Sequence, residues 1–525
     1  MKDDRIQRSA AFAAAFALLA SAGLAAFACD TRSGFETPRP PRLVVLYATC
    51  TLAKGELSPY APAADWTPRL EEFARRGVVF ARHQTETSFS GVAFASIFSG
   101  RQADRHGIFT HPTRLDERVP LITASFAEAG FDVWFWGDHA MASPALGYAR
   151  GTPPAQIVSG SADFISPDPR RAHPEREAFL RGDDPRFLRL LDRLREEPGR
   201  RALVVTNFTV THAPYSIAWL AELCRDVPTA CADRPPRLEE TAEFFWQHYV
   251  DLSWNFDATV SRLGLSKEHV ARIARVAELL YRANVHRLDG LFGGVVDAIA
   301  AHGLLEESVI AFTADHGEML HRDGAILHWN HGFALAPESL GVPWLLVAPG
   351  VAPRRWSGVT RSIDVFPTLA GLAGVTIPDG AVDGVDLAPA LRGERPPPIL
   401  QAFSHTAILP PELLRASLAR GGTRLDALHA GRGAEGIWVA VRDGDRVYKI
   451  VRFGPGASFE RRVFDLDADP TETRDLHDPN DADQARVFEM LERKRQDLLR
   501  AYDASASPQP EPGSLDWLRR LGYVE

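Results

Sequence analysis

The sequence predicts an α/β fold, with a mainly parallel central sheet between helices and a smaller C-terminal α+β subdomain. Between residues 42 and 398, short apolar runs that are typical of buried strands alternate with helical patterns. This alternation indicates strands joined by helical crossovers, which cover both faces of a parallel sheet. In residues 399–525, short strand-like segments follow one another directly, and this arrangement is typical of antiparallel pairing.

The N-terminal segment has the pattern of an export signal. In residues 1–29, basic residues precede an apolar run rich in Ala and Leu, which predicts a signal peptide or a membrane anchor. Cys29 is a candidate site of lipoprotein acylation, and the alternative is a plain signal that leaves it idle. Residues 30–41 contain three prolines and are predicted to be a tether. We therefore expect an exported protein, which is periplasmic, membrane-tethered or secreted.

Net charge and cysteine content narrow the function classes. The formal net charge of −9 and the absence of a basic run argue against nucleic acid as a partner. Cys224 and Cys231 lie in one polar segment, which favours a local disulfide in an oxidising compartment. The alternative is a pair of idle surface thiols.

In the 42–398 domain, strands are predicted where apolar runs lie between breakers, and helices where apolar residues recur at helical spacing. The predicted strands are residues 43–48, 131–136, 202–208 and 309–314, and a segment at Trp344. The predicted helices are residues 67–77, a small-residue helix from about Ser90 to residue 99, residues 121–130 and residues 363–369.

A long helical insert is predicted at about residues 216–280. It carries several aromatic residues, namely Trp219, Phe244, Phe245, Trp246 and Tyr249. These aromatics either contact a lipid, glycan or aryl group or pack against the helices of the insert. In the C-terminal subdomain, strands are predicted at residues 438–442, 446–451 and 462–466, before a charged helix that ends near residue 502.

Two residues that can bind a metal ion directly follow the apolar run 309–314. The run ends at Asp315 and His316, and Gly317 then allows the chain to turn. Ligands bind at the carboxyl ends of the strands of an α/β sheet, and carboxylate oxygen and imidazole nitrogen both ligate zinc well. The pair therefore predicts a metal site, and the alternative is a capped strand end with a salt-bridged histidine.

Residues 313–318, TADHGE, resemble the second metal motif of the sulfatase family within the alkaline phosphatase superfamily. Residues 338–343, ESLGVP, and residues 467–476, DADPTETRDL, are similar to later segments of that family. The resemblance runs in order from about residue 42 to the C-terminus. It implies a sulfatase-like fold and hydrolysis of sulfate, phosphate or phosphonate monoesters, with one divalent metal ion. The substrate would be a small anionic ester, on a glycan or a lipid or free.

The resemblance places the nucleophile at Ser90, counted back from the helix end Ser99-Gly100-Arg101. The alternative is that Ser90 is only a helix cap. The sulfatase pattern has a proline and an arginine after the nucleophile, whereas this chain has Phe94 at the arginine position. Conversion to formylglycine is therefore not expected, and a plain serine favours phosphate or phosphonate over sulfate esters.

The resemblance also places a metal ligand at the end of the first strand, where the family has an aspartate and this chain has Cys50. A thiolate ligates zinc well but suits calcium or magnesium poorly. Cys50, Asp315 and His316 are therefore predicted to hold zinc, with calcium, magnesium and manganese as the alternatives. Cys50 as a lost ligand, or as a small buried hydrophobe, remains open.

Two histidines occupy motif positions whose family roles are proton transfer and charge control. His212 lies in residues 211–215, THAPY, and His331 lies in residues 331–333, HGF. His328 and His139 are weaker candidates, and a structural role is the alternative for each of the four. The rival interpretation of the chain is a catalytically degenerate family member that binds an anionic ligand or partner.

Overall fold

The computed structural model describes residues 40–110, 113–159, 181–213, 215–322, 328–332, 334–407, 437–452 and 458–502. These residues belong to one unit, Pro40–Glu525. The predicted signal or anchor of residues 1–29, with Cys29, and the tether up to residue 39 lie outside the described residues. Within the described part, none of the helices combines the length and the apolar character that crossing a membrane requires.

The central sheet has eight strands in the described part of the chain, in the order β4-β3-β5-β1-β6-β7-β2-β8. Every strand runs parallel to the others except β7, which is antiparallel to both of its neighbours. The strand bounds are β1 Leu43–Thr49, β2 Val78–Gln84, β3 Asp132–Gly137, β4 Ile157–Ser159, β5 Ala202–Asn207, β6 Ser308–Ala314, β7 Trp344–Val347 and β8 Arg354–Arg361. The prediction of a mainly parallel sheet is confirmed.

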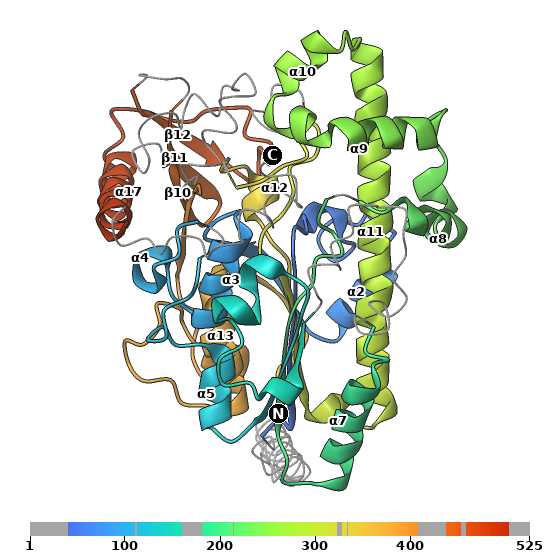
Figure 1. Ribbon diagram of the computed structural model, residues 1–525. Helices are drawn as coiled ribbons and strands as arrows, with labels where there is room; N and C mark the ends of the chain where they lie inside the picture. The colour runs from blue at the N-terminus through green and yellow to red at the C-terminus, as the bar shows by residue number, and fades with distance from the viewer. Residues whose placement is uncertain are drawn as a thin grey trace, which may run out of the picture. The chain divides into compact units, whose positions relative to one another are not determined.

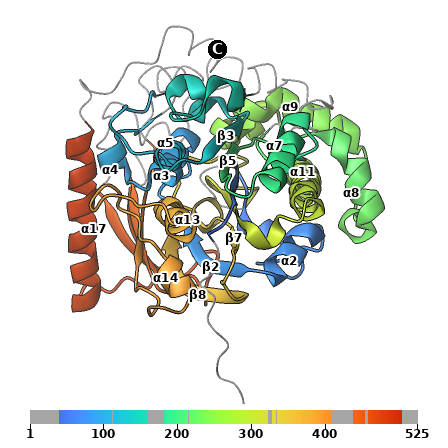
Figure 2. The same cartoon turned by 90° about the horizontal axis from the view of Figure 1, so that it is seen from below.

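Helices cover both faces of the sheet (Figures 1 and 2). The helices on one face are α3 Ser90–Ser99, α5 Ile122–Glu128 and α13 Val365–Ala373, and those on the other are α2 Pro68–Arg75, α7 Pro185–Glu196 and α11 Lys267–Ala301. Alternate residues of β1 enter two separate buried clusters, so that Val44 packs with the α3 side and Tyr47 with the α11 side. Because both faces are buried, the strand reads as a continuous apolar run.

The helical insert consists of α8 Leu220–Asp226, α9 Leu238–Trp254, α10 Phe256–Arg262 and the first half of α11. A disulfide joins Cys224 in α8 to Cys231 in the turn that follows, with a Cα–Cα distance of 5.4 Å. This distance lies inside the limit of about 7 Å for a disulfide. The bridge fixes the start of the insert.

The aromatic residues of the insert pack mainly against one another and against the loop at Trp329. The Phe245 side chain is fully buried, and its ring lies 4.5 Å from Trp246 and 5.1 Å from Trp329 between centroids. The Tyr249 hydroxyl donates to the Trp329 carbonyl at 3.0 Å. Packing is therefore the better interpretation of this cluster, and it ties the insert to the loop that carries His331.

Asp289 joins α11 to the start of α2. Its carboxylate accepts hydrogen bonds from the backbone N–H of Arg69 at 3.0 Å and of Leu70 at 2.7 Å. These two amides lie in the first turn of α2, which has no acceptor of its own. Burial raises the pKa of Asp289 to about 7, although the two amide donors act in the opposite direction.

Asp289→Ala should lower the free energy of unfolding by about 2 kcal/mol, because two amides lose their acceptor. The folded-state pKa of Asp289 lies above that of an unfolded aspartate. Its contribution to stability is therefore full below about pH 4 and is lost as the pH rises through 7. In urea denaturation, the free energy of unfolding of the wild type should exceed that of Asp289→Asn by a larger margin at pH 5 than at pH 8. A margin that is the same at both pH values would contradict the account.

The C-terminal subdomain has a four-stranded antiparallel sheet in the order β12-β11-β10-β9, covered by one helix in its described part. Its elements are β9 Gln401–His405, β10 Val439–Asp443, β11 Arg446–Val451, β12 Glu460–Asp465 and α17 Ala482–Ala501. The inner residues of this sheet belong to the same buried cluster as α3 and α13. The subdomain therefore packs directly on one face of the main domain (Figure 1).

Candidate active site and metal centre

The candidate site lies where β1 and β6 end side by side. Cys50 directly follows β1, and Asp315 and His316 directly follow β6. The Asp315 N–H donates to the Thr49 carbonyl at 3.0 Å, which continues the parallel pairing into the site. Ser90 is the first residue of α3, and its hydroxyl lies 3.5 Å from the Cys50 sulfur. The fold thus brings together four of the residues predicted from the sequence.

Ser90 and His316 form a hydrogen-bonded pair. The distance from Ser90 Oγ to His316 Nε2 is 2.9 Å. His316 Nδ1 lies 2.8 Å from the Gly317 carbonyl, and a carbonyl only accepts, so Nδ1 carries the proton. Burial lowers the pKa of His316 to about 3, so the ring is neutral and its Nε2 accepts from the Ser90 hydroxyl. The first turn of α3 adds a positive dipole end at Ser90.

Asp315 is held with one oxygen bonded and the other directed into the site. Its Oδ1 accepts from the N–H groups of Thr51 at 2.9 Å and His316 at 2.6 Å. Its Oδ2 is buried, accepts no hydrogen bond of good geometry among the described residues, and lies 3.4 Å from His316 Nε2. Thr51 adopts φ of 57°, a strained conformation for a β-branched residue, and this conformation accompanies the donation of its N–H to Asp315.

Three buried side chains fit a metal ion. One ligand atom from each of Cys50, His139 and Asp315 lies within 4.8 Å of the other two. Sulfur, nitrogen and oxygen donors in one small set suit zinc better than calcium or magnesium. The free oxygen of Asp315 supports this fit, because a buried carboxylate oxygen without a donor is costly unless a cation faces it.

Burial sets the acid–base properties of Cys50 and Asp315. Burial, followed by the Asp315 carboxylate, raises the pKa of the Cys50 thiol well above its usual range. Burial also raises the pKa of Asp315, although His316 acts against it. A bound cation would reverse both effects, because it favours the thiolate and the carboxylate.

The three side chains that could hold a metal ion differ in one member from the predicted set. His139, which the sequence ranks low, lies with Cys50 and Asp315, whereas both ring nitrogens of His316 are engaged by Ser90 and Gly317. His139 follows β3, whose carboxyl end lies at the same edge of the sheet. That position is the signal that marks His139 from the sequence.

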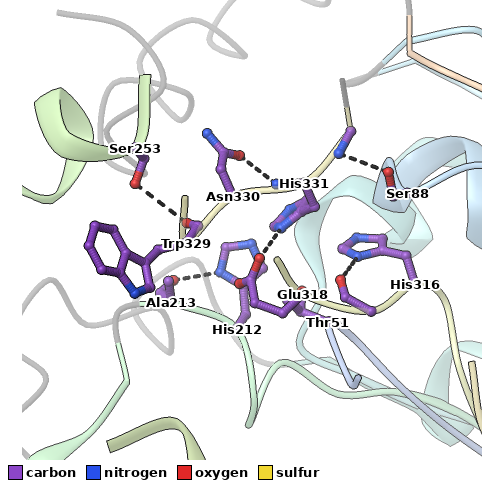
Figure 3. A network of polar contacts seen from close by, with 12 residues as sticks. Thr51, Ser88, His212, Ala213, Ser253, His316, Glu318, Trp329, Asn330 and His331 are labelled. Carbon is purple, nitrogen blue, oxygen red and sulfur yellow. Dashed lines mark hydrogen bonds and ion pairs between the residues drawn. The ribbon is translucent and has the colours of Figure 1, made fainter. Parts of the chain in front are cut away.

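His212 and His331 lie beside His316 (Figure 3). The ring centroids of His331 and His316 are 4.2 Å apart, and those of His331 and His212 are 5.4 Å apart. Burial holds the pKa of His331 well below its usual range and also lowers that of His212. His328 lies apart from this group, with its ring 4.1 Å from Phe256.

Glu318, the last residue of the TADHGE motif, is a site residue whose role was not predicted. Its Oε1 lies 3.3 Å from His331 Nδ1, and its Oε2 accepts from the Tyr215 hydroxyl at 3.0 Å. Burial raises the pKa of Glu318 to about 7, against the opposing effects of His212 and Tyr215. Glu318 therefore fixes the ring of His331, and no local sequence pattern reveals this contact.

Phe94 occupies the position where the family pattern has an arginine. Its side chain is fully buried, and its ring lies 5.2 Å from that of His139. The phenyl ring covers the cluster with an apolar surface and supplies no positive charge. This is the clearest chemical difference between the site and the sulfatase pattern.

Comparison with known proteins agrees with these motifs. The family model named Sulfatase matches residues 51–375. A choline-sulfatase of Rhizobium meliloti is 25% identical over 461 residues, covering 80% of each chain. Human arylsulfatase A is 26% identical over 411 residues, covering 71% of this chain and 72% of that protein.

Solved structures share the fold. A phosphonate monoester hydrolase of Agrobacterium radiobacter superposes with a TM-score of 0.59 at 21% identity, covering 88% of this chain and 95% of that one. A protein solved with its substrate D-glucosamine-2-N,6-O-disulfate superposes with a TM-score of 0.61 at 15% identity, covering 90% of this chain and 100% of that one. From the order of its motifs, its fold and the extent of the family match, this chain belongs to the sulfatase family.

Proposed function

We propose that the protein is a metal-dependent hydrolase of phosphate, phosphonate or sulfate monoesters in which Ser90 is the nucleophile. The observation that carries the proposal is the 2.9 Å contact between Ser90 Oγ and the unprotonated Nε2 of His316. A nucleophile hydrogen-bonded to an oriented base is the arrangement that covalent catalysis needs. Phosphate and phosphonate esters are favoured over sulfate esters, because Ser90 lies outside the sequence pattern that leads to formylglycine.

In the first step, Ser90 Oγ attacks the phosphorus or sulfur atom of the ester. His316 Nε2 accepts the hydroxyl proton as the new bond from oxygen to phosphorus or sulfur forms. The bond from that atom to the ester oxygen then breaks, and the leaving alkoxide takes a proton. In the second step, a water molecule attacks the covalent adduct and gives a proton to the histidine that protonated the leaving oxygen. The bond from phosphorus or sulfur to Ser90 Oγ breaks, and His316 returns its proton to Ser90 Oγ, which releases the acid and free Ser90.

His331 and His212 are the candidates for protonating the leaving oxygen. This role requires that the negative charge of the bound ester raise the pKa of one of them and so favour its charged imidazolium form. His331 is held by Glu318 through its Nδ1, so that the opposite nitrogen is the one directed away from that carboxylate. His212 lies against His331 with their rings nearly perpendicular, at 77°. Both rings lie to the same side of His316 (Figure 3).

Cys50, His139 and Asp315 would hold the metal ion, with zinc the best fit to their donors. When bound, it would supply positive charge that lowers the pKa of the nucleophile and stabilises charge on the transferred group. This charge would offset the apolar Phe94 at the arginine position. His316 remains with Ser90 in this arrangement and acts as the base.

We also infer that the protein is exported and acts on a small anionic ester, free or carried by a glycan or lipid. The disulfide between Cys224 and Cys231 supports an oxidising compartment. The apolar run before Cys29 supports a secretory signal or anchor.

The second candidate function is binding of an anionic ligand or partner without turnover. The observation that favours it is the joint loss of the family aspartate, replaced by Cys50, and of the arginine, replaced by Phe94. If Cys50 keeps its proton, the cluster holds a cation weakly, and the site could bind an anion without reacting with it.

An assay with three aryl esters separates the two functions. The purified full chain is given an aryl phosphate, an aryl phosphonate monoester and an aryl sulfate, before and after chelation and with zinc restored. We expect hydrolysis of the phosphorus esters to exceed that of the sulfate ester, to fall with chelator and to return with zinc. Binding of the esters without turnover of any, in the zinc-loaded protein, would favour the second function.

A further inference from the structure

A cavity that is separate from the candidate active site lies between the main sheet and the C-terminal sheet. Its volume is about 440 Å³, in the range of small-molecule sites. Residues from the turn after β1, from β2 and β8, and from β10 and β11 line it. None of its lining residues belongs to the candidate active site. The cavity is therefore a separate feature of the fold.

The cavity wall carries more positive than negative charge. The five cationic residues that line it are Lys54, Arg82, Arg355, Arg442 and Lys449. Only two carboxylates, of Asp467 and Glu472, line it with them. Asp445 lies next to it and pairs with Arg82. Two of the five cations are thus neutralised within the wall, Arg82 by Asp445 and Asp467, and Lys449 by Glu472.

The other three cations have only neutral partners among the described residues. Lys54 Nζ donates to the Ala81 carbonyl at 3.1 Å, and Arg355 Nη1 donates to the Pro59 carbonyl at 3.0 Å. Arg442 Nε donates to the Gly444 carbonyl at 3.1 Å. A carbonyl satisfies one N–H but does not cancel a charge. Arg442 is buried, Lys54 is half-buried and Arg355 is exposed, so the cost of an unpaired charge is largest at Arg442.

The pKa of Lys54 is lowered by burial and by repulsion from these neighbouring cations. Burial, followed by Arg442, Arg355 and Arg82, lowers its pKa to about 7, and only Asp467 acts in the opposite direction. These are the charged groups that face it from β2, β8, β10 and the loop after β12. The wall thus carries an excess of positive charge, which a bound anion would offset.

We propose that this cavity binds the sulfate or phosphate group of a small anionic ligand, held by Lys54, Arg355 and Arg442. Guanidinium groups match the oxygens of a tetrahedral oxyanion, and the ammonium supplies a point charge beside them. Apolar side chains complete the wall, at Leu335, Leu340, Val447 and Leu466. The cavity volume exceeds what a bare oxyanion needs, so the ligand carries an organic body that covers these side chains.

Calorimetric titration of the full chain with sodium sulfate, against sodium chloride at equal ionic strength, tests the oxyanion part of the site. Lys54→Met and Arg442→Gln should each weaken sulfate binding roughly tenfold or more, because each removes a charged donor. Arg262→Gln is the matched control, since Arg262 is paired with Asp251 on the insert, and it should bind sulfate as the wild type does. Sodium phosphate and a sugar phosphate, titrated in parallel, distinguish a preference for the free ion from one for an organic ligand.

Two further readouts exclude a merely structural role. Sulfate stays a dianion between pH 6 and 8, so affinity should fall up to about tenfold over this range as Lys54 loses its proton, and Lys54→Met should remove the dependence. Without sulfate, both variants should melt no lower than the wild type, because they relieve repulsion. Unchanged sulfate affinity in both folded variants, or a melting temperature lowered equally with and without sulfate, would overturn the proposal.

Discussion

Ser90→Ala should lower kcat/KM for the best ester substrate by roughly a thousandfold or more, because it removes the attacking oxygen and leaves His316 without a group to activate. The matched control is Ser99→Ala. Ser99 is buried in the same helix, and its hydroxyl donates to the Ala95 carbonyl at 2.5 Å, away from the site. The Ser99→Ala variant should keep a kcat/KM within a few-fold of the wild-type value.

The kinetic comparison is made at saturating zinc with the preferred aryl ester, and circular dichroism checks that each variant is folded. Because Ser90 would act in bond formation, kcat should carry most of the loss and KM little. If Ser90→Ala kept more than about a tenth of the wild-type rate, the attacking group would have to be water or another side chain.

Cys50→Asp should lose zinc and activity together. The substitution replaces the sulfur of the predicted zinc set with a hard oxygen ligand, so zinc affinity should fall by about a hundredfold or more. His139→Ala should have an effect of similar size, because His139 supplies the nitrogen of the same cluster. Zinc affinity is measured by competition with a chromophoric chelator, which reports on the metal independently of activity.

His328→Ala is the matched control for His139→Ala, because His328 packs against Phe256 outside the cluster. The other interpretations of Cys50 give different results. A gain of metal affinity and of hydrolysis in Cys50→Asp would mean that Cys50 is a lost ligand. An unchanged metal content and rate would mean that Cys50 is only a packed side chain.

The fold was largely predictable where burial on both faces makes a strand continuously apolar. The predicted runs 43–48, 202–208 and 309–314 agree with β1, β5 and β6 within about one residue. The strands β2, β4, β8 and β9 were not predicted. β4 has only three residues, and the other three strands carry arginine, histidine or glutamine among their apolar residues, so their patterns do not separate them from loops.

The site was predictable where each residue follows its own strand or begins its own helix. Asp315, His316, Cys50 and Ser90 are such cases, and the structure places them together. Which of His316 and His139 lies with Cys50 and Asp315 was not predictable, because it depends on where each ring points. The role of Glu318 was not predictable for the same reason, because its contact with His331, 13 residues later, depends on the fold and not on a local pattern. The cavity between the two sheets is lined by residues from segments that are distant in the sequence, so no local sequence pattern predicts it.

The most direct test is mass spectrometry of the protein quenched in acid during turnover of an aryl phosphate or phosphonate. Peptide mapping should show the phosphoryl or phosphonyl group on Ser90, and unreacted Ser90 with the mass of plain serine. The adduct should be absent from Ser90→Ala and present in Ser99→Ala. Turnover with no adduct on Ser90 at any quench time, or with the group on another residue, would contradict covalent catalysis by Ser90.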